Sequence, residues 1–186
     1  MKLEPLRHFY RARFFMMLGR PGRAIEGFER ALKADPGFAR AASSLAYAHG
    51  LLGHDELALE YFRDALRLTP DDAVALFDVG FILARIGRHG EAIEMFGRSV
   101  ALNDRLDRAW YGLGMSHAHL GGHVEAAQAL EHAARLQPMN PHAWYNLGMA
   151  YHSSGQQEKL LAAIAHLDRF DPKMALRLTH DSGTAA

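Results

Sequence analysis

Apolar residues recur along this chain with the spacing of amphipathic helices, and the helical segments come in pairs. The first segment of a pair has large or small apolar residues at i, i+3 and i+7, as in Trp144, Leu147 and Tyr151. The second segment repeats this period, as in the run 126–133. The pattern therefore predicts antiparallel helix pairs and no strands.

This pattern returns every 34 residues without an insertion, and the run 143–149 matches the run 109–115 one period earlier. A glycine closes each first helix, because glycine readily adopts the left-handed conformation that ends a helix. A proline near the end of four of the five units stops the second helix. The register predicts five units, at residues 5–38, 39–72, 73–106, 107–140 and 141–174. The repeated positions are Gly19, Gly53, Gly87, Gly121 and Gly155, and then Pro36, Pro70, Pro138 and Pro172.

Tryptophan, Leu-Gly, tyrosine, glycine, alanine, an aromatic residue, alanine and proline follow one another at fixed spacing in these units. In this the chain resembles the tetratricopeptide repeat family, from Pro5 to about Met174. The resemblance implies an all-α fold, a right-handed α-solenoid of five antiparallel helix pairs. The sequence departs from the family pattern at His8, Arg11, His49, Leu76, Ser99, Asp104 and His117.

The chain end after the fifth unit is short. We expect a single solenoid domain over residues 1–178 and a flexible tail over 179–186. Lys173 to Leu178 can form only one or two helical turns, so Leu160, Ile164 and Leu167 are expected to stay partly uncovered. An uncovered end would favour contact with a partner or formation of a homo-oligomer through the C-terminal end.

In the resembling family the first helices line a concave groove that holds a peptide. Carried onto this chain, the groove combines aromatic residues, methionines and arginines, although the whole chain has 21 basic and 21 acidic residues. We therefore expect an apolar or amphipathic partner segment whose acidic residues face the arginines. The predicted groove residues are Phe9, Arg13, Arg40, Tyr47, Phe77, Phe81, Arg85, Arg108, Tyr111, Met115, Tyr145, Asn146 and Met149.

These features favour a non-catalytic protein–protein interaction module, an adaptor or scaffold that binds a protein or peptide partner. The alternative is a structural protein that self-associates through its ends or its groove. Family resemblance indicates only a class of function, since function depends on the site. The partner is not named by the sequence.

The composition of the chain argues against several other classes of function and site. The chain has 186 residues and no cysteine, which excludes disulfides, thiolate catalysis and cysteine-based zinc sites. The balanced charge argues against nucleic acid as a partner. No apolar run is long enough to span a bilayer, and no signal peptide pattern is present. We therefore predict no membrane partner and a cytoplasmic location.

The twelve histidines raise the possibility of a metal site. His117 and His119 are two residues apart on a helix and point in different directions, and Gly121-Gly122 separates His119 from His123. His49 and His117 occupy positions typical of packed neutral imidazoles. No nucleophile motif or phosphate-binding loop occurs. We predict no metal, no cofactor and no enzymatic activity.

Overall fold

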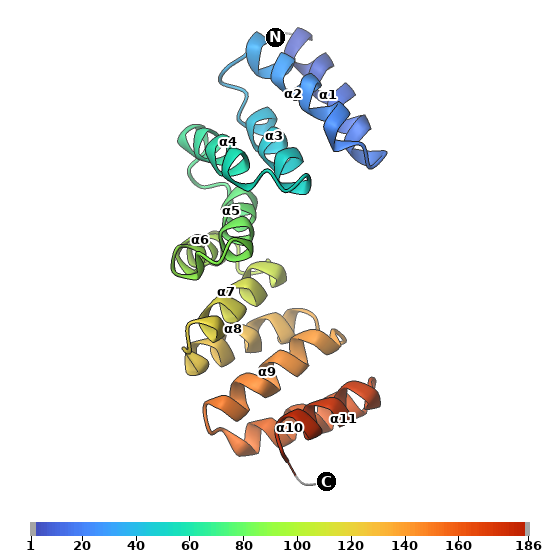
Figure 1. Cartoon of the computed structure of the whole chain (residues 1–186), viewed down its shortest axis with the longest axis vertical. Coiled ribbons are helices and arrows are strands. Elements are labelled where there is room, and N and C mark those ends of the chain that lie inside the picture. The colour runs from blue at the N-terminus through green and yellow to red at the C-terminus, as the bar shows by residue number, and fades with distance from the viewer. Residues whose placement is uncertain (1–2, 185–186) are drawn as a thin grey trace. The chain divides into compact units, whose positions relative to one another are not determined.

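The computed structural model describes residues 3–184, and that part of the chain contains only helices (Figure 1). The predicted all-α fold is confirmed, and the packed helix pairs include α1 with α2, α3 with α4, α7 with α8 and α9 with α10, as predicted. The helices are α1 (Leu3–Met17), α2 (Pro21–Ala34), α3 (Ala39–Leu51), α4 (Asp55–Leu68), α5 (Ala73–Arg85), α6 (His89–Leu102), α7 (Asp107–His119), α8 (His123–Leu136), α9 (Pro141–Ser153), α10 (Gln157–Asp168) and α11 (Pro172–Asp181).

The chain forms two compact units, Met1–Ile82 and Leu83–Ala186, with the boundary inside α5. In the first unit, helices α1 to α3 bury one core cluster between them. In the second, α8 to α11 bury another. The first cluster consists of Phe9, Ala12, Ala24, Phe28, Ala31, Ala41, Leu45 and Ala48. The second includes Ala126, Leu130, Leu147, Tyr151, Leu160, Leu167 and Leu178.

The turn within each helix pair depends on a glycine in the left-handed region. In the last pair Gly155 has φ of +73°, and the backbone N–H of Gln156 donates to the carbonyl of Tyr151 at 2.8 Å. The same geometry occurs at Gly19, with φ of +66°. Since other residues are strained there, these glycines account for the fixed length of every turn.

Small residues allow the helices of one pair to approach closely. A Cβ atom on Gly114 of α7 would lie 2.6 Å from Cγ of Leu130 and 3.1 Å from the carbonyl oxygen of Ala126 in α8. The lack of a side chain at Gly114 is what allows this contact. In the last unit the corresponding glycine has a different neighbour, because Gly148 faces Leu178 of α11, 2.4 Å from the position of its missing Cβ.

The expectation for the C-terminal end is wrong. Helix α11 has ten residues and continues to Asp181, so Thr179 to Asp181 are helical and are not a flexible tail. The side chain of Asp171 accepts a hydrogen bond from the backbone N–H of Met174 at 3.0 Å and caps the helix, and Pro172 occupies its first turn. Ala175 and Leu178, three residues apart, then face the core. Residues 185–186 of the predicted tail lie outside the described part.

As a consequence α11 covers the last helix pair. Leu160 and Leu167 have no exposed surface, and Ile164 is half-buried. The fifth unit therefore does not present the uncovered apolar end that the sequence predicted.

None of the helices among residues 3–184 is both long enough and apolar enough to cross a bilayer.

Candidate functional site

The predicted groove residues lie on the first helices of the repeats, and they fall in both compact units. The first unit holds those on α1, α3 and the beginning of α5, and the second unit holds Arg85 and those on α7 and α9. The two sets are considered separately. The first-unit residues are Phe9, Arg13, Arg40, Tyr47, Phe77 and Phe81.

In the first unit two exposed arginines converge on one buried ring. Phe9 is only 2% exposed and packs against Phe38, with ring centroids 4.9 Å apart. The guanidinium carbons of Arg13 from α1 and Arg40 from α3 each lie 5.9 Å from the centroid of Phe9. Arg40 also lies 5.7 Å from the Phe38 ring. The rings hold the two cations at the surface by cation–π attraction and leave their N–H donors available.

Two aromatic side chains of the first unit are exposed at equivalent positions of consecutive repeats. Tyr47 on α3 is 46% exposed and Phe81 on α5 is 53% exposed. Phe77 is buried at 9% exposure, with its ring centroid 6.3 Å from that of Phe81. Phe9 and Phe77 therefore serve the core, whereas Tyr47 and Phe81 present apolar surface that a partner can cover.

In the second unit the predicted polar residues already bind one another. The side-chain amide of Asn146 donates to the hydroxyl of Tyr111 at 2.7 Å and joins α9 to α7. Burial raises the pKa of Tyr111 above its usual value, and the hydrogen bond from Asn146 acts in the opposite direction. The pair thus positions two neighbouring first helices.

Tyr145 is engaged by the C-terminal helix. Its hydroxyl donates to Oδ2 of Asp181 at 2.6 Å, and the guanidinium carbon of Arg177 lies 5.0 Å from its ring centroid. The hydrogen bond to Asp181 raises the pKa of Tyr145, followed by burial. Asp181 and Arg177 were missed by the sequence analysis, because the sequence marks neither with a repeated position.

A hollow of about 280 Å³ opens beside the Tyr111 side chain. Its wall offers an acidic residue, a cation and several uncharged polar groups, so it can accept a polar side chain but has no fixed charge preference. Of the remaining predicted residues, Arg85 is exposed, while Met115 and Met149 are half-buried. The hollow is lined by Asp107, Arg108, Tyr111, Ala133, Gln137, Asn140, His142 and Ala143.

Two tryptophan–histidine stacks repeat one period apart. Trp110 lies 4.2 Å from His132, and Trp144 lies 4.0 Å from His166, measured between ring centroids. Each indole N–H donates to a backbone carbonyl of the preceding loop, at 2.8 Å for Trp110 and 2.9 Å for Trp144. The stacks fix each first helix to its own second helix. The spacing of 34 between the two histidines was the available sequence signal, but it did not reveal the tryptophan as partner.

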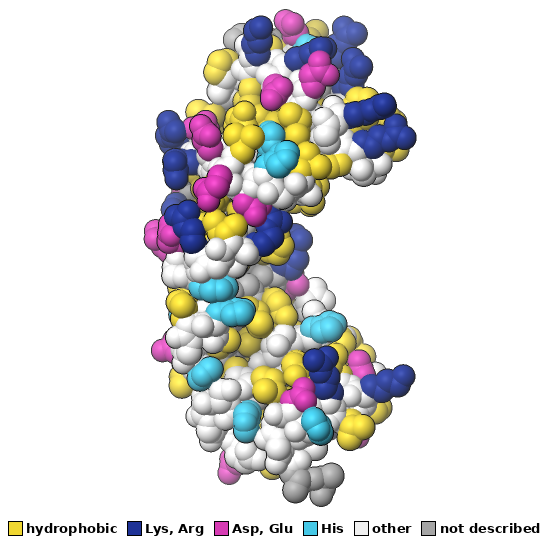
Figure 2. Space-filling model, viewed as in Figure 1, with side chains coloured by type: hydrophobic (Ala, Val, Ile, Leu, Met, Phe, Trp, Pro, Cys, Tyr) yellow, Lys and Arg dark blue, Asp and Glu magenta, His cyan; other side chains and the backbone are white. Residues whose placement is uncertain are grey.

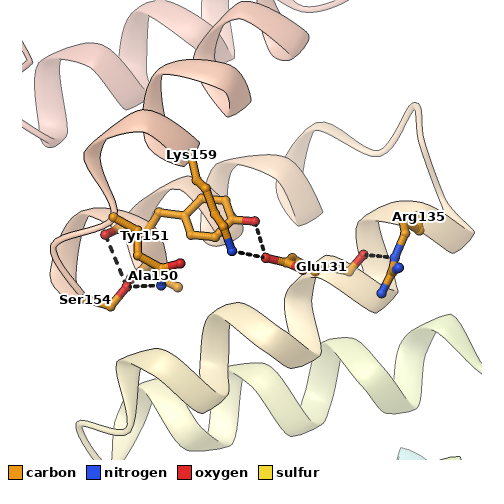
Figure 3. A network of polar contacts seen from close by, with 7 residues as sticks. Glu131, Arg135, Ala150, Tyr151, Ser154 and Lys159 are labelled. Carbon is orange, nitrogen blue, oxygen red and sulfur yellow. Dashed lines mark hydrogen bonds and ion pairs between the residues drawn. The ribbon is translucent and has the colours of Figure 1, made fainter.

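Glu131 joins three helices of the second unit (Figure 3). Its Oε1 accepts hydrogen bonds from the hydroxyl of Tyr151 at 2.6 Å and from Nζ of Lys159 at 3.1 Å. Burial by itself raises the pKa of Glu131, but these two bonds together with the positive charges of Lys159 and Arg135 outweigh it, so the pKa is lowered. The pKa of Tyr151 is raised, by burial first and then by the hydrogen bond to Glu131. The contacts stabilise packing among α8, α9 and α10.

Four of the histidines form two pairs. Nδ1 of His49 lies 3.3 Å from Nδ1 of His54, and the His49 ring stacks on Tyr61 with 5.4 Å between centroids. His89 and His119 stack with centroids 4.3 Å apart. Within residues 3–184, no group of three or more histidine, aspartate or glutamate side chains is arranged to hold a metal ion.

Comparison with known proteins identifies one family by sequence and many solved structures with a similar fold. The sequence model described as "Tetratricopeptide repeat" matches residues 11–73, 80–138 and 122–174. No curated protein matches the sequence significantly.

Among solved structures, YrrB, described as "a TPR protein with an unusual peptide-binding site", aligns with a TM-score of 0.80 at 22% identity, covering 93% of this chain and 90% of its own. MamA from Desulfovibrio magneticus RS-1 gives 0.79 at 18% identity and 96% coverage of both chains. PilF from Pseudomonas aeruginosa gives 0.80 at 18% identity, covering 96% of this chain and 84% of its own. At these identities the likeness shows the all-α solenoid fold alone.

Proposed function

The chain belongs to the tetratricopeptide repeat family, and we propose that it is a non-catalytic adaptor whose first helices bind an amphipathic peptide segment of a partner protein. Proteins of this family act as protein-interaction modules. The observation that carries the finer proposal is the convergence of Arg13 and Arg40 on Phe9. Two outward-facing guanidinium groups at one place favour a carboxylate of the partner.

The apolar part of the partner segment would cover Tyr47 and Phe81. Both rings are about half exposed at repeat-equivalent positions of the unit that holds the arginines. Aromatic residues are efficient binding anchors, because a large surface is buried with few rotatable bonds. A peptide with acidic and apolar residues would therefore use the first unit's cations and rings together.

The second-unit residues contribute differently to this proposal. The polar groups of Tyr111, Asn146 and Tyr145 are engaged within the protein, so these side chains supply shape. Within the second unit itself, the further proposed contact residues are Met115, Met149, Arg85 and Arg108, and the flexible thioethers of the two methionines suit an irregular partner. YrrB, which has the same fold, is described as having a peptide-binding site, and this supports the class of ligand proposed here.

Selection from a random peptide display library tests the proposal and requires no purified partner protein. We expect enriched peptides that combine acidic residues with aromatic or aliphatic ones. Selected peptides are then titrated by fluorescence anisotropy against wild type, Arg13→Ala/Arg40→Ala and Tyr47→Ala/Phe81→Ala. Each double variant should weaken binding about tenfold or more, as expected for central interface residues.

The matched control is Leu57→Ala/Leu68→Ala on α4, where the side chains are 37% and 46% exposed but lie on a second helix. Its affinity should equal that of wild type. Enriched peptides without acidic residues, or equal affinity for all four proteins, would contradict the proposal. A cytoplasmic location stays a prediction.

Self-association through the ends or the groove was the alternative. Its main reason was the expected uncovered end of the fifth unit, and α11 removes that reason by burying Leu160 and Leu167. An apparent molecular mass that rises with protein concentration in sedimentation equilibrium would support self-association again.

A further inference from the structure

Helix α1 carries apolar residues on two different sides. One face carries Pro5, Phe9 and Ala12, which are buried against the rest of the first unit. The other face carries a stripe of residues spaced by three or four, so they align along the whole helix. We define the α1 stripe as Leu3, Leu6, Tyr10, Phe14 and Met17.

Four of the five residues of the α1 stripe are exposed to solvent, and Leu6 is half-buried. The exposed fraction of Leu3 is 71%, that of Phe14 is 57% and that of Met17 is 81%. Single exposed apolar residues are ordinary on protein surfaces, but an aligned row on one helix is a contiguous apolar surface that favours a partner. The most exposed members, Leu3 and Met17, are at the two ends of α1, so the stripe forms a ridge over the full length of the helix.

Arginines border the α1 stripe on both sides. From the helical period, Arg7 and Arg11 follow one edge and Arg13 follows the other. The acidic residue of this helix, Glu4, lies beyond Arg11 and pairs with His8 at 4.0 Å. Residues 3–34 hold seven lysine or arginine residues and three glutamates, although the whole chain is neutral. Figure 2 shows these basic side chains gathered over the N-terminal helices.

We propose that the α1 stripe and its bordering arginines dock on an anionic phospholipid surface. An apolar helix face lies at the boundary between headgroups and acyl chains, while basic residues on its flanks reach the lipid phosphates. Arginine suits this place, because its aliphatic stem follows the apolar face and its charged end turns outward. An open depression of about 680 Å³ beside the stripe is lined by Leu3, Glu4, Leu6, Arg7, His8 and Tyr10, and within it Arg7 is the cation for a phosphate while the carboxylate of Glu4 lies against His8.

Charge and shape favour this occupant over others. A second copy docked stripe to stripe would bring arginines against arginines, and like charges facing each other oppose such pairing. A partner protein would need a receptor groove shaped to the ridge, whereas a bilayer interface adapts to it. The expectation of no membrane partner rested on the lack of a spanning segment, and a helix that lies in the interface needs none. The proposal shares Arg13 with the proposed peptide site, but its tests change only residues that lie outside that site.

Co-sedimentation with lipid vesicles tests the proposal on the full chain. The probes are vesicles of phosphatidylglycerol and phosphatidylcholine in equal parts, and vesicles of phosphatidylcholine alone. Wild type should bind the anionic vesicles about tenfold or more tightly than the neutral ones, and added salt should weaken this binding. The variant Leu3→Ser/Phe14→Ser should lose about tenfold or more. The variant Arg7→Gln/Arg11→Gln should lose about fivefold for each arginine.

Matched controls place the same changes elsewhere. Leu120→Ser/Val124→Ser alters residues that are 60% and 51% exposed in the second unit, and Arg63→Gln/Arg169→Gln removes two exposed arginines from other parts of the chain. Both should bind as wild type does. Circular dichroism tests whether each variant is folded. If the variant Leu3→Ser/Phe14→Ser is not folded, the single change Met17→Ser, at the most exposed residue of the α1 stripe, takes its place.

The proposal is overturned if wild type stays in the supernatant with anionic vesicles, or if it binds neutral and anionic vesicles equally. It is also overturned if the folded stripe variant binds as tightly as wild type, since another surface would then hold the lipid.

Discussion

The hydroxyl of Tyr145 in α9 donates a hydrogen bond of 2.6 Å to the carboxylate of Asp181 in α11. Tyr145 was predicted as a groove residue, and Asp181 was expected in a flexible tail. Their contact makes the last helix part of the folded second unit, and it occupies a side chain that would otherwise face a partner. The end of the fifth repeat is therefore closed by the chain itself.

The first prediction concerns the anchor of α11. Leu178 has no exposed surface and lies against Gly148, so Leu178→Ala should lower the free energy of unfolding by about 2–5 kcal/mol, because it leaves a cavity. Leu176 on the same helix is 70% exposed, and Leu176→Ala should change that free energy by less than about 0.5 kcal/mol. Urea denaturation measures both. Equal effects of the two changes would mean that α11 does not pack as described.

The second prediction compares two helical glycines. Gly114→Ala brings a methyl group to 2.6 Å from Leu130 and 3.1 Å from the backbone of Ala126, and it should cost about 1–3 kcal/mol through overpacking. Gly97 in α6 has no atom within 4 Å of the new methyl group. Gly97→Ala should stabilise the protein by about 0.4–1 kcal/mol, because alanine restricts the unfolded chain. Thermal unfolding should show melting temperatures that move in opposite directions.

The third prediction concerns the Glu131 contacts. Tyr151→Phe removes a buried hydroxyl that donates to this carboxylate at 2.6 Å, and it should cost about 1–3 kcal/mol. The Lys159 side chain is 55% exposed in its ion pair with Glu131 at 3.1 Å, so Lys159→Met should cost less than about 1 kcal/mol. Chemical denaturation measures the free energy of unfolding of both variants. A larger loss of this free energy for Lys159→Met than for Tyr151→Phe would assign the stabilisation to the ion pair.

The fourth prediction is a pH dependence. The pKa of His49 is lowered from its usual value near 6.5, mainly by burial and then by His54, while Glu29 acts in the opposite direction. The unfolded chain therefore binds more protons than the folded one in this range, so the free energy of unfolding falls as the pH drops below about 6.5. Neutral His49 stacks on Tyr61, and this arrangement is favoured above that range.

The variant His49→Phe isolates this effect, since it keeps an aromatic ring at the position and removes the titrating group. Its stability should change less than that of wild type between neutral pH and pH values below the histidine range. The same dependence in both proteins would assign the effect to other histidines. Denaturation curves at a series of pH values provide the measurement.

The sequence alone determined the helices and their turns. The period of 34 residues predicted the helix pairs and the left-handed glycine turns, such as the one at Gly155, and the structure confirms both. All depend on local backbone preferences, or on contacts between neighbouring helices that recur in each unit. A repeated local signal is readable because each unit contacts mainly its neighbours.

Only the tertiary structure decided what happens where the repeat is broken. Asp181 and Leu178 lie beyond the fifth unit, so no earlier unit indicates that they bind Tyr145 and face Gly148. The same holds for the candidate site. The sequence placed Arg13 and Arg40 on first helices, but their convergence on Phe9 depends on how α1 packs beside α3. Contacts between side chains distant in sequence follow from packing, which repeat spacing alone does not specify.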